Sequence, residues 1–136
     1  MINFNYETKF FLDNEEKSAG WISNVIIAEG FKEDEINYVF CDDAYLHKLN
    51  VEFLNHDTLT DIISFDYSVG KIIQGDVFIS IERVKENAVE FNVPFLNELN
   101  RVMVHGVLHY CGYKDKSEND AKLMRKKEDH YLSMLV

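Results

Sequence analysis

The stretch "FLNELNRVMVHGVLHYCG", residues 95–112, decides the fold of this chain. Pro94 suits the first turn of a helix, and Gly112 suits its end. Between them, apolar side chains lie around most of the helical circumference, at Phe95, Leu96, Leu99, Val102, Met103, Val104, Val107 and Leu108. A helix that is apolar nearly all round is normally buried. We therefore expect this helix at the centre of the protein, with the other segments packed around it.

The remaining segments predict a small sheet and further helices. Alternating or β-branched residues mark strands at 2–7, 36–42, 61–67 and 76–81, and the last two are expected to pair as an antiparallel hairpin. Helical spacing marks residues 15–29, a helix capped by Asp42 or Asp43, one from Ser80 to about 91, and a last one capped by Ser117. The order predicts an α+β or α/β fold, in which a mixed four-stranded sheet packs with about five helices. We expect a single domain over residues 1–136.

Composition limits the class of protein. The chain of 136 residues has 46% hydrophobic and 28% charged residues and contains no apolar run long enough to span a membrane. We expect a cytoplasmic protein without a membrane partner. Its two cysteines, Cys41 and Cys111, are too few for a disulfide framework and are expected to be reduced and packed. Cys111 lies close to two histidines, so a role as a metal ligand is a minor alternative.

Charge is distributed unevenly along the chain. The formal net charge of −10 argues against non-specific binding of polyanions, because lysine and arginine supply the attraction to phosphate. Residues 1–100 carry 7 basic and 19 acidic groups, whereas residues 101–136 carry 7 basic and 5 acidic groups. The end of the chain that holds the two histidines is therefore the cationic end.

Two histidines on the central helix are candidate metal ligands. Positions i and i+4 of a helix lie one above the other, so His105 and His109 can present their rings to one point. Gly112 can end the helix and let the chain fold back, which brings the carboxylate of Asp115 to the same point. Such a set leaves a fourth position for water, which is typical of catalytic sites. Zinc, nickel, manganese and iron all suit these ligands, and zinc is the expected ion.

Two other interpretations of these histidines stay open. Both can be ordinary polar residues of a buried helix, since a pair at this spacing also arises by chance. The spacing also matches the metzincin protease template in four places. In those proteases, however, a glutamate acts as general base where this chain has Gly106, so peptide hydrolysis by that mechanism is disfavoured.

The sequence "HGVLHYCGYKD", residues 105–115, resembles the H-G-x-L-H-x-x-G-Y-D-H signature of the YbeY family. "LN" at 49–50, "TDIISF" at 60–65, "GDVFIS" at 75–80 and "LMRKKED" at 123–129 are similar to further segments of that family, in the same order, and the last of them matches the family's M-x-x-x-E segment. The resemblance implies a metal-dependent, single-strand-specific endoribonuclease. It further implies a role in late maturation of ribosomal RNA, at the 3′ end of the 16S RNA, and in ribosome quality control. It implies one divalent ion, and ribosomal RNA as substrate.

Two departures from the family pattern bear on activity. Asp115 stands where the family usually has a histidine ligand, which adds one negative charge and makes the bound ion a weaker Lewis acid. Leu54 stands where the family commonly has an arginine linked to catalysis, and leucine cannot bind phosphate. The candidates that could replace this arginine are His56, Arg101 and Lys114.

Other polar residues have candidate roles beside the metal. Asp61 is the candidate catalytic base, and either Asp61 or Asp76 could instead orient a ligand imidazole. For both, a turn or cap role is equally open. Thr60 and Ser64 could line a pocket or simply bond to backbone. Tyr113 could stack on a base or pack beside its loop.

The basic run "RKK", residues 125–127, has two interpretations. It could contact RNA phosphates, or it could form a solvated helix face together with Glu128 and Asp129.

Two alternatives to an endoribonuclease stay open, and the acidic net charge and Leu54 favour the first of them. One is a metal-stabilised module that assists ribosome assembly by binding a ribosomal protein or a GTPase. The other is a metzincin-like hydrolase of a different substrate.

Overall fold

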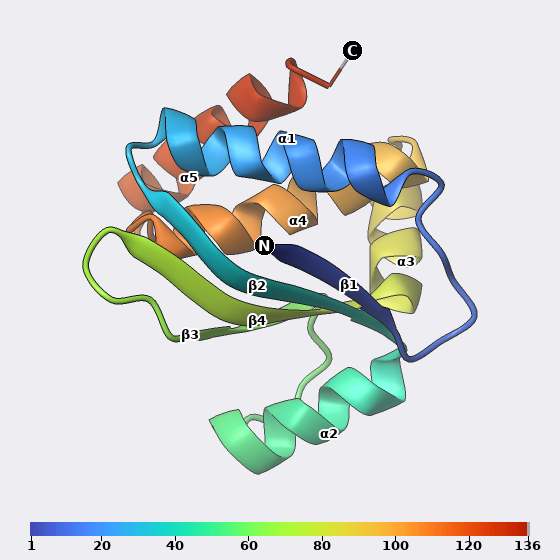
Figure 1. Cartoon of the computed structure of the whole chain (residues 1–136). Helices are drawn as coiled ribbons and strands as arrows, with labels where there is room; N and C mark the ends of the chain where they lie inside the picture. The colour runs from blue at the N-terminus through green and yellow to red at the C-terminus, as the bar shows by residue number, and fades with distance from the viewer. Residues whose placement is uncertain (136) are drawn as a thin grey trace.

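A sheet of four strands in the order β1-β2-β4-β3 lies at the centre of the computed structural model, which describes residues 1–135 (Figure 1). β1 (Ile2–Tyr6) pairs in parallel with β2 (Lys32–Cys41), and β2 pairs in parallel with β4 (Ile72–Ser80). β3 (Ile62–Asp66) pairs antiparallel with β4. The sheet is therefore mixed, and the expected hairpin of residues 61–67 and 76–81 is confirmed.

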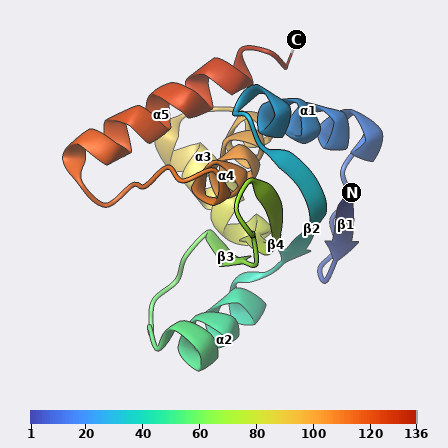
Figure 2. The same cartoon turned by 60° about the vertical axis from the view of Figure 1, so that its left-hand side comes forward.

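The helices cover the two faces of the sheet unequally. The helices are α1 (Glu15–Ala28), α2 (Asp43–Leu54), α3 (Ile81–Phe91), α4 (Phe95–Tyr110) and α5 (Glu118–Leu132). α1, α4 and α5 lie on one side of the sheet, whereas α2 lies on the other (Figures 1 and 2). α4 runs through the middle of the first group and packs against α1, α3 and α5. The α+β architecture expected from the sequence is confirmed. Within the part of the chain that the structure describes, no helix is long and apolar enough to cross a membrane.

Alternation in β2 explains which face of the sheet is buried. Ile36, Tyr38 and Phe40 are fully buried and belong to the main core, together with Leu99, Met103 and Leu108 of α4. Asn37, between them, faces the other way and donates through Nδ2 to Oδ1 of Asp76 at 3.0 Å. The Tyr38 hydroxyl donates to the carbonyl of Met103 at 2.8 Å, so even this polar group is satisfied inside the core. The sheet thus fixes the position of α4.

Two strands start earlier than the sequence indicates. β2 begins at Lys32 and β4 at Ile72, each four residues before the expected start, because Lys32 and Glu33 pair with Ile72 and Ile73. The segment "KEDE", residues 32–35, is uniformly charged and has no alternation to reveal a strand. Backbone pairing with β4 decides the conformation of this segment, and the side chains of the segment do not reveal that pairing.

Gly75 on β4 allows the end of α4 to approach the sheet closely. A Cβ at this position would lie 2.5 Å from the carbonyl oxygen of Phe65 and 2.6 Å from the ring of Tyr110. The Tyr110 hydroxyl donates to the carbonyls of Phe65 and Asp76, at 3.0 Å each. A side chain at Gly75 would therefore displace Tyr110, the neighbour of His109.

We predict that Gly75→Ala lowers the free energy of unfolding by about 3 kcal/mol, because the added methyl overpacks a buried contact with backbone. Urea unfolding followed by circular dichroism measures the change. The matched control is Gly20→Ala in α1, where a Cβ would meet nothing within 4 Å. That substitution is expected to stabilise the protein by about 0.5 kcal/mol through helix propensity. Equal effects of the two substitutions would contradict the close approach at Gly75.

Candidate metal centre

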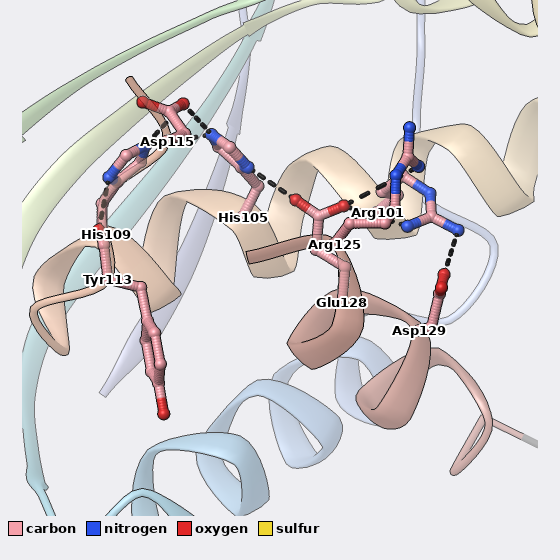
Figure 3. A network of polar contacts seen from close by, with 8 residues as sticks. All are labelled: Arg101, His105, His109, Tyr113, Asp115, Arg125, Glu128 and Asp129. Carbon is pink, nitrogen blue, oxygen red and sulfur yellow. Dashed lines mark hydrogen bonds and ion pairs between the residues drawn. The ribbon is translucent and has the colours of Figure 1, made fainter. Parts of the chain in front are cut away.

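His105 and His109 face each other near the end of α4 (Figure 3). They lie one helical turn apart, and their Nε2 atoms are 3.0 Å apart. The two rings are nearly perpendicular, at 85°, with centroids 4.5 Å apart. Each imidazole therefore directs one nitrogen toward the same point, as the i, i+4 spacing predicts.

Asp115 reaches this point because the chain reverses direction after α4. Gly112 has a φ of 98°, a conformation that favours glycine, and its N–H donates to the carbonyl of His109 at 3.0 Å. The N–H of Tyr113 donates to the carbonyl of Leu108 at 3.1 Å, which completes a glycine-ended helix terminus. Oδ2 of Asp115 then lies 3.1 Å from Nε2 of His105 and 3.3 Å from Nε2 of His109.

The triangle of these three atoms fits one face of a tetrahedral metal site. Its sides measure 3.0, 3.1 and 3.3 Å. Ligands bound to zinc at 2.0–2.2 Å in tetrahedral geometry are about 3.3–3.6 Å from one another. Within residues 1–135, this is the one group of three such side chains whose ligand atoms converge. Cys111 is not part of it, and burial raises the pKa of its thiol to about 12.

The hydrogen-bond partners of the two Nδ1 atoms show where the ring protons lie, and they leave the lone pairs of both Nε2 atoms directed toward the carboxylate of Asp115. Nδ1 of His109 lies 2.9 Å from the carbonyl oxygen of Tyr113, which can only accept, so this nitrogen carries the proton. Nδ1 of His105 lies 2.6 Å from Oε2 of Glu128 and donates to that carboxylate. In neutral rings both Nε2 atoms are then acceptors, and they face the Asp115 carboxylate. Three acceptors at this distance repel one another unless a proton or a metal ion lies between them.

Negative charge around His105 strengthens this demand for a cation. Burial alone would lower the pKa of His105, but the hydrogen bond to Glu128 and the charges of Glu128, Asp115 and Asp61 outweigh it. The pKa of the ring is therefore raised, because the surrounding carboxylates stabilise its protonated form.

Glu128 on α5 is a buried part of the centre that the sequence did not single out. Its side chain is 7% exposed and accepts from His105 on one oxygen and from Nη1 of Arg101, at 2.9 Å, on the other. Nη2 of Arg101 donates to Oδ1 of Asp129 at 2.7 Å (Figure 3). The interpretation of Glu128 as part of a solvated face is thus wrong. One signal was present, because Met124 and Glu128 match the M-x-x-x-E segment of the family resemblance.

Asp61 and Asp76 do not orient a ligand imidazole, which was one of the alternatives that the sequence left open. Both Nδ1 atoms already have partners, Glu128 and the carbonyl of Tyr113. Asp76 accepts from Asn37 on the sheet. Asp61 lies just before β3, where its carbonyl accepts from the N–H of Ser80 at 2.9 Å. Local sequence gave no way to distinguish these carboxylates from Glu128, which reaches the site from another helix.

An open pocket of about 370 Å³ adjoins two of the three candidate ligands, His105 and Asp115. It is lined by Asp61, Ile62, Glu98, Arg101, Val102, His105, Asp115, Ala121, Met124, Arg125 and Glu128. Burial raises the pKa of Asp61 and of Glu98, and the charge of Asp61 adds to the effect on Glu98. The pocket therefore joins the metal centre to two carboxyl groups and two guanidinium groups.

Of the remaining candidate residues, one lines the pocket and the others lie outside its lining. Thr60 donates to the carbonyl of Ile62 at 3.3 Å, and neither Thr60 nor Ser64 lines the pocket. The hydroxyl of Tyr113 donates to Glu29 at 2.6 Å, so this ring packs beside its loop. Of the run at 125–127, Arg125 lines the pocket, whereas Lys127 pairs with Glu29 at 3.2 Å.

The position of the missing arginine lies outside the pocket lining. Leu54 ends α2 and is 42% exposed. His56 and Lys114 are exposed and do not line the pocket either. Arg101 does line it, but its guanidinium is bound to Glu128 and Asp129. In the "LN" segment, Asn50 is buried and donates to the carbonyl of Thr58 at 2.8 Å, which holds the loop leading to Asp61.

The fold and the site together define the class of protein. It is a small α+β protein whose buried helix ends in two histidines, and the carboxylate of the following loop meets them beside an open pocket. This is a candidate metal centre of the catalytic kind. Comparison with known proteins agrees. The profile of the family described as Endoribonuclease YbeY matches residues 3–136. The chain belongs to this family.

Curated relatives cover nearly all of the chain. "Endoribonuclease YbeY" of Flavobacterium johnsoniae is 66% identical over 134 residues, which are 98% of this chain and 96% of that protein. The protein of the same name from Flavobacterium psychrophilum is 61% identical, with the same coverage of both chains. The solution structure of TM1509 from Thermotoga maritima has a TM-score of 0.73 and 26% identity, and covers 99% of this chain and 89% of that one. The family expected from the resemblance and the fold expected from the order of helices and strands are confirmed.

Proposed function

We propose that this protein is a metal-dependent endoribonuclease that hydrolyses phosphodiester bonds of single-stranded RNA. Ribosomal RNA is the proposed substrate, in cytoplasmic maturation of the 16S 3′ end and in ribosome quality control. Membership of the YbeY family and the printed names of its relatives support the activity. A ribosomal protein or a GTPase is a proposed partner, because a protein with a net charge of −10 needs a localised basic groove or a protein adaptor to approach RNA.

The convergence of three lone pairs carries the metal part of the proposal. Nε2 of His105, Nε2 of His109 and Oδ2 of Asp115 would hold the ion. Glu128 and the carbonyl of Tyr113 would keep the ring protons at Nδ1 and the rings in place. One bound Zn²⁺ would supply a Lewis acid for a phosphoryl oxygen and a water of lowered pKa.

Asp61 and Arg125 have separate proposed tasks in the pocket. Asp61 lies on the wall beside His105 and is the candidate to accept the proton of the attacking water. Arg125 lies at the pocket with 59% of its side chain exposed, and Glu128, its paired carboxylate, is 3.9 Å away. Its donors can therefore turn to a phosphate, which makes Arg125 the candidate for the task of the arginine absent at Leu54.

A protease-like mechanism is not supported by the surroundings of Gly106. A Cβ at this position would lie 3.1 Å from Ile62 and from Val77, on the side of α4 that faces the sheet. A glutamate side chain there would have to displace Ile62 and Val77. The general base of the metzincin proteases thus has no equivalent position on this helix.

The direct test compares three substrates. Zinc-loaded protein is incubated with a structured RNA that has single-stranded segments, with casein and with a simple phosphodiester. The proposal predicts cleavage of the RNA within its single-stranded segments, inhibition by a chelator, and no cleavage of casein. An RNA that stays intact while casein is cut would contradict it.

Arg125→Ala is expected to raise KM for RNA about tenfold, because one charge-assisted contact to phosphate contributes about 1.4 kcal/mol. The zinc content should not change, since Arg125 is not a ligand. Steady-state cleavage of a fluorescent RNA measures KM and kcat. The matched control is Lys126→Ala, which removes a neighbouring exposed charge outside the pocket lining. An equal rise of KM in both variants would mean that only the general charge of α5 matters.

A further inference from the structure

Glu29, far from the metal centre in sequence, lies at the end of α1 and accepts three side-chain hydrogen bonds. Its Oε1 accepts from the hydroxyl of Tyr113 at 2.6 Å. Its Oε2 accepts from the hydroxyl of Tyr131 and from Nζ of Lys127, the latter at 3.2 Å. The carboxylate is 9% exposed. Burial opposes its charge, but the three donors outweigh burial and lower its pKa.

Tyr113 connects this carboxylate to the candidate ligands. Its carbonyl accepts from Nδ1 of His109 at 2.9 Å, and its N–H donates to Leu108 at 3.1 Å. Its ring lies under Lys127 Nζ, which is 5.5 Å from the ring centroid. One residue thus joins α4 through its backbone and α1 and α5 through its side chain. In Figure 3 the Tyr113 ring points away from the three ligands while its backbone stays beside His109.

Apart from the contacts of the Asp115 carboxylate with His105 and His109, the stretch after Tyr113 has little else to hold it. Within residues 1–135, no backbone hydrogen bond involves positions 114–116, and α5 begins only after its cap at Ser117. Asp115, whose side chain is 40% exposed, is the candidate ligand on this stretch. Its position therefore depends on the fixed point at Tyr113.

We propose that Glu29 is a positioning residue of the metal centre and acts through Tyr113. By fixing the Tyr113 hydroxyl, Glu29 sets the carbonyl that orients His109 and the start of the loop that carries Asp115. This inference rests on the proposed metal site and adds a residue that touches neither ion nor substrate. Outer partners of ligand histidines typically contribute 10–100-fold to metal affinity.

Tyr113→Phe and Tyr131→Phe form a matched pair for the test. Each removes one hydroxyl that donates to Glu29 and keeps the ring, but Tyr131, unlike Tyr113, makes no hydrogen bond to a candidate ligand. We expect zinc affinity, measured by competition with a chromophoric chelator, to fall about tenfold in Tyr113→Phe and less than twofold in Tyr131→Phe. Nitrogen NMR of the His109 ring should change in the first variant only. Urea unfolding of the metal-free proteins separates these effects from general stability.

Glu29→Gln assigns the effect to the carboxylate. The variant is expected to lose about as much zinc affinity as Tyr113→Phe. Adding Tyr113→Phe to Glu29→Gln should lower the affinity by less than a further twofold, because both substitutions remove the same contact between Glu29 and the Tyr113 hydroxyl. Equal affinities of the Tyr113→Phe and Tyr131→Phe variants, or full additivity in the double variant, would overturn the inference. A wild-type protein that binds no zinc would instead overturn the proposed function itself.

Discussion

Replacing His109 with alanine is expected to abolish zinc binding and to lower RNA cleavage by about a thousandfold or more. The variant leaves one imidazole and one carboxylate, and two ligands do not hold zinc in a catalytic site. The loss follows because the Lewis acid and the activated water contribute several kcal/mol to the barrier, and each 1.36 kcal/mol is a factor of ten. Mass spectrometry of bound metal and cleavage of a fluorescent RNA measure the two effects on the same preparation.

His130→Ala is the control for this experiment. His130 lies on an exposed part of α5, outside the group of converging ligands, so both metal content and cleavage should stay near the wild-type values. Full cleavage by the His109→Ala protein, at wild-type metal content or without metal, would contradict a role for this site in catalysis.

Replacing Glu128 with glutamine is expected to weaken the protein and the metal centre together. The carboxylate accepts on both oxygens, from His105 and from Arg101. An amide offers only one acceptor, so its NH₂ group must face a donor on one side. We expect a loss of about 3 kcal/mol in the free energy of unfolding of the metal-free protein, because a buried charge loses its partner. Zinc affinity should fall about 10–100-fold.

Asp129→Asn provides the comparison for Glu128→Gln. Asp129 binds the same guanidinium, but its side chain is 58% exposed. Loss of an exposed ion pair typically costs less than about 1 kcal/mol, and zinc affinity should not change. Urea unfolding and chelator competition measure both variants. If Glu128→Gln affected stability but left zinc affinity intact, Glu128 would be part of the packing and not a support for His105.

The sequence predicts those parts of the site that depend on local spacing. His105 and His109 meet because they share one helix face, and Gly112 marks the turn that returns Asp115. The buried character of α4 also follows from its own residues. Each of these features involves segments less than a dozen positions apart, where helix geometry alone fixes the arrangement.

The partners that hold the ligands could not be predicted in this way. Glu128 is 23 positions from His105, and Glu29 is 84 positions from Tyr113. Both contacts depend on how α1 and α5 pack against α4, and the charged run around Glu128 is indistinguishable by composition from an exposed face. Only the M-x-x-x-E segment of the family resemblance marked Glu128, and nothing in the sequence marked Glu29.

The most direct measurement is X-ray absorption at the zinc edge of the zinc-loaded wild-type protein. The proposed centre predicts one zinc per chain, bound by two imidazole nitrogens and one carboxylate oxygen at about 2.0–2.2 Å, with a light fourth ligand that exchanges with solvent. A spectrum with sulfur scattering or without imidazole scattering, or a protein that retains no zinc, would contradict it.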